Sequence, residues 1–334
     1  MRMNIKTPYL LFLGDAADPL AAKVAQGICD WRPENALGQY RMPNCQADLG
    51  LQDMSIEQAI TAGAKTMIIG VANRGGVISQ DWIEVLQKAL EQGLDLAAGL
   101  HNRLADVPEL KATADRLGRQ LFDVRHPSQA FEVGAGIRRS GKRLLPVGTD
   151  CSCGKMYTAL ALEKEMRARG MDADFRATGQ TGILITGRGV SIDAVVADFI
   201  SGAVEWLSPE NDPEHWDLVE GQGSLYHPSF AGVTLGLIHG AQPDAMVLCH
   251  EPTRTHMRGL PSFALPSLEQ AMDAALRAAH LTNPDARFVG ISVNTSKLSP
   301  QEADEYLRST EQAHGLVTVD PVRQGVGRIV DQLN

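Results

Sequence analysis

Short apolar runs alternate with amphipathic segments in the first part of the chain. Each apolar run ends in glycine or polar residues, as buried parallel strands do, and the segments between them carry apolar residues at helical spacing. This alternation predicts a doubly wound parallel sheet. The expected strands are residues 9–13, 37–41, 65–71, 94–100 and 121–124, and the expected helices begin at residues 18 and 55 and cover residues 81–92 and 107–117.

The pattern changes between residues 125 and 143, which are rich in glycine and arginine, and strand–helix alternation then resumes. A break of this kind marks a domain boundary. We therefore expect two α/β domains, at residues 1–137 and 138–334. The strands expected in the second are residues 144–147, 174–178, 215–219, 245–249, 288–293 and 316–319, and its helices are residues 157–169, 193–205, 267–279 and 300–314 with a short C-terminal piece. Loops are expected around His227 and His239.

One glycine-bracketed loop joins the first strand of the second domain to its first helix. A strand–loop–helix of this kind is typical of a phosphate-binding loop, because glycine lets successive N–H groups point at an anion, the helix start adds its positive dipole end, and lysine supplies a mobile charge. A generic glycine-bearing turn is the alternative. The residues expected to bind an anionic cofactor are Gly148, Thr149, Asp150, Cys151, Ser152, Cys153, Gly154, Lys155 and Met156.

The loop departs from a standard Walker sequence in two places. Five residues separate its two glycines, where a Walker loop has four. Met156 stands where a serine or threonine hydroxyl normally binds Mg²⁺, and no His-x-x-x-His pair marks a zinc site, so no metal is expected. Cys151 or Cys153 could act as a nucleophile, since thiolates are favoured at a helix N-terminus, but small packing residues are the simpler interpretation.

Polar residues at other strand ends are candidates for chemistry, because ligands bind at the carboxyl ends of strands in parallel sheets. Glu220 follows a strand in the position of a Walker B acid, and His250 ends a strand beside Glu251 and Arg254. Either Glu220 or His250 could serve as a general base, and the alternatives are a loop-capping acid and a structural histidine. Gly14 stands alone after the first strand, which gives no support to a nicotinamide cofactor.

Arginines near expected strand ends are candidates for binding substrate carboxylates, which guanidinium groups recognise bidentately. We assign this role to Arg74, Arg188 and Arg254. Gln180 and Thr181, in the glycine-spaced loop at residues 178–181, are expected to line the same pocket. Each arginine alone is more simply explained as a surface residue, but two or more in one pocket would suit an anionic substrate.

Composition limits the partners of the chain. Its 334 residues carry a net charge of −9, and aromatic residues make up 5%. An acidic chain with few aromatics is a poor match for nucleic acid or an anionic membrane surface. No apolar run is long enough to span a bilayer, and the apolar N-terminal run reads as a buried strand rather than a signal peptide. Five scattered cysteines indicate reduced thiols in a cytoplasmic protein, and paired domains suit a homo-oligomer.

The glycine-bracketed loop, which opens Gly148-Thr149-Asp150, resembles that of the dethiobiotin synthetase-like branch of P-loop proteins. That branch also has five residues between its glycines. Glu220-Gly221 and Asn294-Thr295 follow later strands in the order of that fold. The resemblance implies a P-loop NTPase-like α/β fold for the C-terminal domain. It also implies an ATP-dependent ligase or kinase as one candidate activity.

The whole chain is similar to a second family, the D-glutamate N-acetyltransferases of D-amino-acid catabolism. The similarity is strongest at residues 70–76, 148–155, 177–189 and 219–224. It implies a Rossmann-like N-terminal domain, a P-loop-like C-terminal domain, and acetyl transfer from acetyl-CoA to the amino group of D-glutamate. A phosphate loop without a Mg²⁺-binding hydroxyl fits this activity, because coenzyme A carries phosphates that can be held without a metal. The resemblance supplies no template for the base, so Glu220 and His250 rest on the residue arguments alone.

Three functions therefore stay open. The preferred one is an acyltransferase that acts on D-glutamate or a close D-amino acid. The second is a ligase or kinase of the dethiobiotin synthetase type, which would bind Mg·ATP tightly and turn it over. The third is a nucleotide- or CoA-sensing regulator, in which the ligand changes partner binding without any chemistry.

Overall fold

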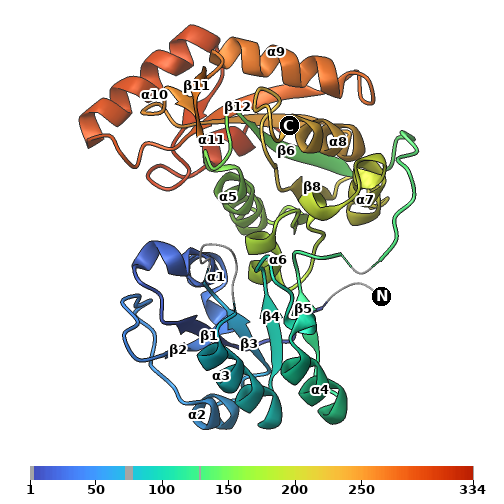
Figure 1. Ribbon diagram of the computed structural model, residues 1–334. Helices are drawn as coiled ribbons and strands as arrows, with labels where there is room; N and C mark the ends of the chain where they lie inside the picture. Colours follow the sequence, from blue (N-terminus) through green and yellow to red (C-terminus); the bar gives the residue numbers. More distant parts are fainter. Residues whose placement is uncertain (1–3, 72–77, 128, 334) are drawn as a thin grey trace. The chain divides into compact units, whose positions relative to one another are not determined.

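The computed structural model describes residues 4–71, 78–127 and 129–333. The chain divides into two compact units (Figure 1). The first comprises Met1–Gln129 and Gly179–Ala194, and the second comprises Ala130–Thr178 and Val195–Asn334. Each unit contains one parallel sheet with helices packed against it. Within the described ranges, no helix combines the length and the apolar character needed to cross a membrane.

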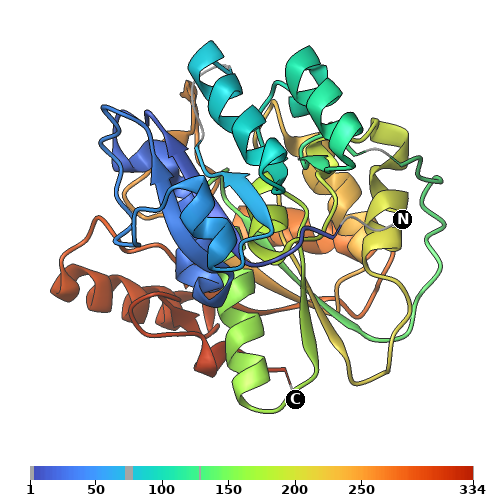
Figure 2. The same cartoon turned by 90° about the horizontal axis from the view of Figure 1, so that it is seen from below.

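The first unit is built on a five-stranded parallel sheet in the order β2-β1-β3-β4-β5. This is the strand order of flavodoxin-like doubly wound proteins. Every residue of β1 is buried, and α3 and α4 lie side by side (Figure 2). Its elements are β1 (Tyr9–Gly14), α1 (Lys23–Trp31), β2 (Ala36–Arg41), α2 (Ile56–Thr61), β3 (Thr66–Ile69), α3 (Gln80–Glu91), β4 (Asp95–Ala98), α4 (Pro108–Leu117), β5 (Leu121–Asp123) and α6 (Gln180–Thr186).

The second unit is built on a six-stranded parallel sheet in the order β13-β12-β9-β6-β8-β7. Strand β6 therefore lies between β9 and β8, and the loop that follows it is flanked by their carboxyl ends. The main elements are β6 (Lys142–Gly148), α5 (Lys155–Ala168), β7 (Ala173–Arg176), α7 (Ile200–Leu207), β8 (Trp216–Val219), α8 (Ala231–Ala241), β9 (Ala245–His250), α9 (Leu268–Ala279), β12 (Arg287–Val293), α10 (Pro300–His314), β13 (Thr318–Val319) and α11 (Gly327–Val330). A small antiparallel hairpin, β10 (His256–Met257) and β11 (Leu260–Ala264), follows β9.

Three helices begin where the sequence signals indicate. Ser55, Ser267 and Ser299 each accept a hydrogen bond from the backbone N–H three residues later, and the glutamine or glutamate there reaches back to the backbone N–H of the serine. These capping boxes satisfy backbone donors that a helix N-terminus leaves without intrahelical partners. The helix start expected at Ser55 is therefore confirmed.

The expected loops around His227 and His239 are only partly correct, because α8 occupies much of this region. Its glycines give it low intrinsic helix propensity, yet they let α7 approach closely. A Cβ on Gly236 would lie 2.7 Å from Ile200 Cγ2, and one on Gly240 would lie 2.4 Å from Ser201 O. Packing against α7 therefore outweighs the local preference, and sequence reasoning missed the helix.

Two further expectations differ from the structure. Residues 180–186 form the helix α6 rather than a pocket-lining loop. Gly27 of α1 makes room for α6, since a Cβ there would lie 3.3 Å from Ile185 Cδ1 and 3.4 Å from Thr181 Cγ2. The helix expected at residues 193–205 begins only at Ile200, after two short 3₁₀ turns at Ile192–Ala194 and Ala197–Phe199. β-Branched valines at positions 195 and 196 and the tertiary contacts of Asp193 favour the turns.

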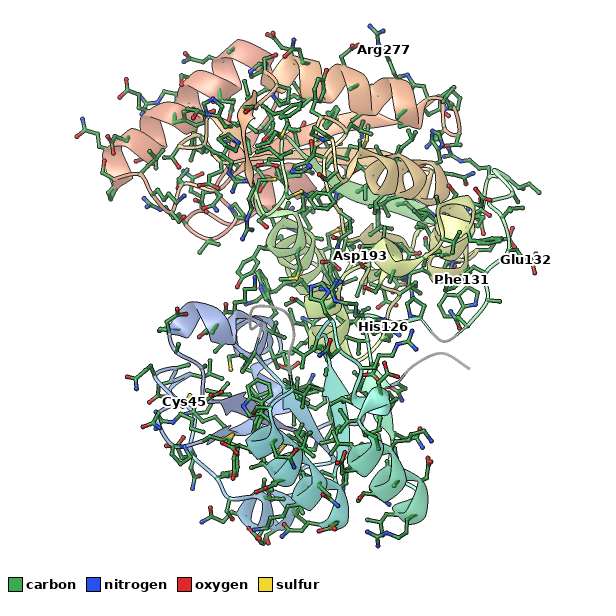
Figure 3. The ribbon with its side chains drawn as sticks, in the orientation of Figure 1. Cys45, His126, Phe131, Glu132, Asp193 and Arg277 are labelled. Carbon is green, nitrogen blue, oxygen red and sulfur yellow. The ribbon has the colours of Figure 1, made fainter. Side chains whose placement is uncertain are left out.

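The division between the units differs from the boundary expected at residues 137 and 138. The segment after Gln129 packs along α7 of the second unit: Phe131 lies edge-on to Trp206 with ring centroids 5.8 Å apart, and Glu205 accepts the N–H groups of Ala135 and Gly136. Figure 3 marks Phe131 on this segment. Residues 179–194, which the sequence assigned to the second domain, belong to the first unit because α6 packs on α1.

Candidate functional site

The loop between β6 and α5 has a conformation that depends on its glycines and on one strained serine. Gly148 has no room for a side chain, since a Cβ would lie 2.6 Å from Cys153 Sγ and 3.1 Å from Lys155 Nζ. Gly154 has a φ of 111°, and Ser152 also has a positive φ, 52°. Left-handed residues within a short loop turn successive N–H groups toward one side. We call residues 148–156 the phosphate loop from here on.

The N–H groups of this loop are available to a ligand. Among the described residues, none accepts a hydrogen bond from the backbone N–H of residues 152–156. These groups include the first two donors of α5, a helix of 14 residues. An anion bound beside these groups would be held by several N–H donors and by the positive end of the helix dipole.

Lys155 adds a buried positive charge to the phosphate loop. Lys155 is 6% exposed. Its Nζ donates to Asp150 O at 2.8 Å and lies 3.7 Å from Cys153 Sγ. No carboxylate in the described part of the chain forms an ion pair with it. Gly221 makes room for the aliphatic stem, since a Cβ there would lie 3.0 Å from Lys155 Cδ. A buried cation without a carboxylate partner is costly, so an anionic ligand would complete this site.

Asp150 does not balance the charge of Lys155, because its carboxylate is already occupied. The side chain is buried, and Oδ2 accepts from Arg254 Nη1 at 2.6 Å and from the backbone N–H of Arg258 at 2.8 Å. Oδ1 accepts from the N–H of Cys151 at 2.7 Å. Asp150 therefore ties the loop to the segment after β9. Its negative charge is compensated by Arg254.

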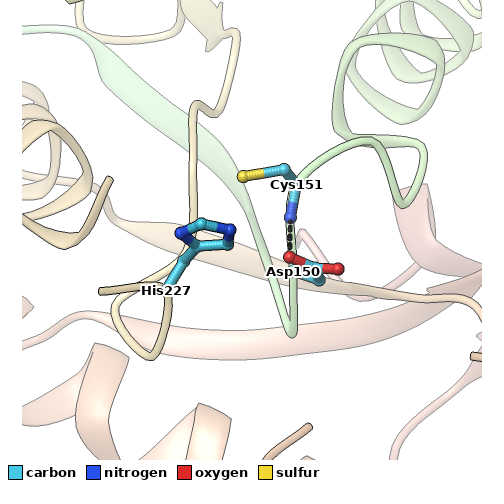
Figure 4. Close-up of side chains that lie close together, drawn as sticks. All are labelled: Asp150, Cys151 and His227. Carbon is cyan, nitrogen blue, oxygen red and sulfur yellow. Dashed lines mark hydrogen bonds between the residues drawn. The ribbon is translucent and has the colours of Figure 1, made fainter. Parts of the chain in front are cut away.

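Asp150, Cys151 and His227 bring a carboxylate, a thiol and an imidazole within 4.8 Å of one another (Figure 4). His227 Nδ1 accepts the N–H of Ser229 at 3.2 Å, which places its proton on Nε2, 3.3 Å from Arg258 O. In that tautomer the imidazole has no lone pair left for a metal or for the thiol proton. Burial also raises the pKa of the Cys151 thiol, which disfavours the thiolate. The three residues therefore fit a role in holding the loop better than metal binding or nucleophilic attack.

Glu220 and Thr178 form one flank of the phosphate loop, at the carboxyl end of β8. Glu220 is buried, and its Oε2 accepts the backbone N–H of Thr178 at 2.8 Å, while the Thr178 hydroxyl donates to Glu220 O at 2.6 Å. Next along the chain, Gly221 packs directly on β6, since a Cβ there would lie 1.8 Å from Pro146 O. Glu220 thus fixes the end of β7 against that of β8.

His250 forms the opposite flank, at the end of β9. Its ring is buried and stacks on Tyr306 with centroids 6.2 Å apart, and Nδ1 lies 3.0 Å from Thr149 Oγ1 of the phosphate loop. Burial lowers the pKa of His250 to about 4. The imidazole is therefore neutral at neutral pH and can accept a proton.

The residues expected to bind the substrate are distributed over both units. Arg74 lies outside the described residues. Gln180 donates to Asp193 at 3.0 Å and 3.1 Å and to Ser191 at 3.0 Å, Thr181 packs on α1, and Arg188 is exposed. These three belong to the first unit. Arg254 belongs to the second, where its guanidinium binds the phosphate loop.

Sequence reasoning did not find Arg258 or Ser224. Arg258 contacts the phosphate loop through its backbone N–H and, with its side chain, through Ser152 Oγ. The Ser224 hydroxyl donates to Thr149 O at 3.1 Å. Ser224 is the last residue of the glycine-rich segment 221–224 after β8, and this segment could have identified it as a candidate site residue. Arg258 lies in the unpredicted hairpin segment, where nothing in the sequence singled it out.

Comparisons with known proteins agree with this architecture. A family model described as "Domain of unknown function (DUF1611_C) P-loop domain" matches residues 132–330, and one described as "Domain of unknown function (DUF1611_N) Rossmann-like domain" matches residues 42–127. The expected α/β fold, with a Rossmann-like N-terminal domain and a P-loop C-terminal domain, is thereby confirmed.

Two curated relatives and one crystal structure match almost the whole chain. A protein named D-glutamate N-acetyltransferase from Tritonibacter scottomollicae is 62% identical over 329 residues, 98% of this chain and 99% of that protein. A protein of the same name from a Pseudoalteromonas species is 52% identical and covers 99% of this chain and 100% of its own. The crystal structure of a DUF1611 family protein from Anabaena variabilis has a TM-score of 0.85 and 31% identity, and covers 98% of this chain and 99% of its own. The chain belongs to the DUF1611 family.

Proposed function

We propose that this protein transfers an acetyl group from acetyl-CoA to the amino group of D-glutamate. The observation that carries the proposal is the 62% identity over nearly the whole chain to a protein named D-glutamate N-acetyltransferase, with a second protein of that name at 52%. Identity at this level, without large unmatched segments in either protein, supports a shared reaction. The sequence resemblance led to the same activity.

The phosphate loop fits the diphosphate of coenzyme A. The N–H groups of residues 152–156, for which the described residues provide no acceptor, and the buried charge of Lys155 would serve as donors for phosphate oxygens. Met156 offers no hydroxyl for Mg²⁺, so the donor set suits phosphates held directly by the protein better than metal-bound phosphates in transfer. Acetyl-CoA would supply the acetyl group as a thioester.

His250 is the better of the two proposed bases. D-Glutamate presents an ammonium group at neutral pH, and this group must lose a proton before its nitrogen can form the new C–N bond. The imidazole of His250 is neutral at neutral pH, and its lowered pKa makes it a weaker proton acceptor than an exposed histidine, so its case as the base rests on its position beside the phosphate loop. In the tautomer protonated at Nδ1, His250 donates to Thr149 Oγ1, and Nε2 accepts the ammonium proton. Glu220 is the second proposed base, but its Oε2 already accepts the N–H of Thr178.

A direct assay tests the proposed function. Purified protein is mixed with acetyl-CoA and either D-glutamate or L-glutamate, and thiol release is followed together with the mass of the acetylated amino acid. We expect thiol release coupled to N-acetyl-D-glutamate. A parallel reaction with Mg·ATP in place of acetyl-CoA tests a ligase or kinase. Turnover of ATP, or no acetylation of D-glutamate or any related amino acid, would contradict the proposal.

We also propose a cytoplasmic homo-oligomer. All five cysteines are free thiols, which suits a reducing compartment. Cell fractionation would test the location. Light scattering on the purified protein would test the oligomeric state, and a monomer at assay concentration would contradict that part of the proposal.

A further inference from the structure

Arg254 lies shortly after the end of β9, and its guanidinium is used almost completely within the protein. Nη1 donates to Asp150 Oδ2 and to Cys151 O, both at 2.6 Å. Nη2 donates to Ser152 O at 3.3 Å and to Glu251 Oε2. Four of the five N–H donors of an arginine are therefore occupied. Three of these bonds end on consecutive residues of the phosphate loop.

These contacts act on the part of the loop that is least stable by itself. Ser152 has a φ of 52°, a left-handed conformation that is unfavourable for a residue other than glycine. Such a conformation persists only where neighbouring groups hold it. Arg254 binds the carbonyl of Ser152 and the carbonyl before it. Pulling the carbonyls to one side leaves the N–H groups directed to the other.

The charge of Arg254 is also balanced inside the protein. Asp150 and Glu251 each form an ion pair with it, and Glu251 Oε1 pairs in addition with Lys297 at 2.6 Å. Two carboxylates thus face two cations, and the arginine side chain is only 17% exposed. Lys155, which no carboxylate of the described residues pairs with, is left to meet a ligand's charge.

We infer that Arg254 is a positioning residue, which fixes the anion-binding shape of the phosphate loop through the carbonyls of Cys151 and Ser152 and the carboxylate of Asp150, and does not bind the carboxylates of the substrate. The inference rests on the proposed function for the identity of the anion. It replaces the substrate-binding role that the sequence suggested for Arg254. It also requires the planar guanidinium fork, because a lysine ammonium cannot span these acceptors together.

Two variants of the full-length protein test this inference, Arg254→Lys and Arg254→Gln. Hydrogen exchange is measured first, without any ligand, at three amides whose hydrogen bonds end on the loop, those of Cys151, Thr158 and Arg258. We expect exchange about 10-fold faster in both variants, because the loop loses the group that holds it. Arg277→Gln is the control: Arg277 is an exposed arginine of α9 (Figure 3), and its variant should exchange like the wild type. Unchanged exchange in the Arg254 variants would overturn the inference.

Binding and kinetics then separate positioning from substrate recognition. We expect the Kd for CoA to rise about 10-fold or more in both Arg254 variants, while the KM for D-glutamate stays unchanged. A higher KM for D-glutamate with unchanged CoA affinity would overturn the inference, as would full rescue by lysine. If the wild type binds no CoA, the proposed acetyl donor is wrong, and the hydrogen-exchange result still decides whether Arg254 holds the loop.

Discussion

Each unit of this protein has a glycine with a positive φ between an early buried strand and the helix that follows, and the surroundings of these two glycines differ. Gly14, at the end of β1, has a φ of 52°, and a Cβ there would lie 2.6 Å from Trp82 Cζ2. The buried indole covers the turn and donates from Nε1 to Asp15 at 3.0 Å. Gly154, after β6, has nothing within 4 Å of its Cβ position. The first turn is closed by packing, and the second is open.

The difference shows that a shared strand–turn–helix plan does not give a shared function. At Gly14 the ring of Trp82 packs directly against the turn, which leaves no room beside the glycine. At Gly154, none of the atoms of the described residues lies within 4 Å of the Cβ position. The turn at Gly14 is therefore filled by core packing, whereas the one at Gly154 leaves open space beside the backbone.

Removing the indole should give the largest effect and should leave the phosphate loop intact. We expect Trp82→Ala to lower the free energy of unfolding by about 3–5 kcal/mol, because it empties a buried site over Gly14 and leaves Asp15 without its donor. Urea unfolding measures this loss, and Trp82→Phe should recover part of it. Affinity for CoA should stay unchanged in variant protein that is still folded. A parallel fall in CoA affinity would mean that the two turns are not independent.

Acid should lower the free energy of unfolding through His250, the buried histidine beside the phosphate loop. In the described residues, the turn after β1 has no buried histidine beside it. The unfolded chain binds a proton at His250 near pH 6.5, whereas the folded protein binds it only near pH 4. Stability should therefore be complete above pH 6.5 and fall between pH 6.5 and 4, by up to about 3 kcal/mol.

The measurement is urea unfolding at a series of pH values. His250→Gln should flatten this part of the stability profile. His101→Gln, at an exposed position of the first unit, serves as the control. An unchanged profile in His250→Gln would show that other groups cause the loss.

Loss of the loop lysine should weaken ligand binding by an intermediate amount. We expect Lys155→Ala to reduce CoA binding by about 1.5–3 kcal/mol, the contribution of a charge-assisted contact. Isothermal titration calorimetry with CoA measures the change. Lys164→Ala, at an exposed lysine of the same helix, is the matched control. Equal affinities of the wild type and Lys155→Ala for CoA would show that Lys155 does not contribute to CoA binding.

The smallest expected quantity is the difference between the two glycine substitutions, and this difference tests the comparison directly. Gly154→Ala should cost about 1–2 kcal/mol of folding stability, from left-handed backbone strain alone. Gly14→Ala should cost about 1–3 kcal/mol more, because the methyl group would also collide with the Trp82 ring. Thermal unfolding ranks the two variants. A larger loss of folding stability for Gly154→Ala than for Gly14→Ala would contradict the comparison, because it would mean that Gly154 is the glycine without room for a side chain.

Local signals predicted most strands and the phosphate loop, because they depend on neighbours in sequence. The apolar run before Gly148, the Gly-Lys pair and the capping serines are all signals of this kind. Helix α8 was missed because its glycines are explained only by the distant α7. Arg254 was found as a candidate, but a sequence does not show which way a guanidinium points. Its bonds to loop carbonyls depend on a fold that brings residues about a hundred positions apart together.

The assignment of Gly179–Ala194 to the first unit means that the chain crosses between its units three times, after residues 129, 178 and 194. No single cut can therefore release either unit intact. A fragment that ends at residue 129 would expose the face of α1 around Gly27, and one that begins at residue 130 would carry α6 without the helix it packs on. Gene fusion at one junction could not have joined two finished modules here. A single insertion of one unit into the other would not give three crossings either.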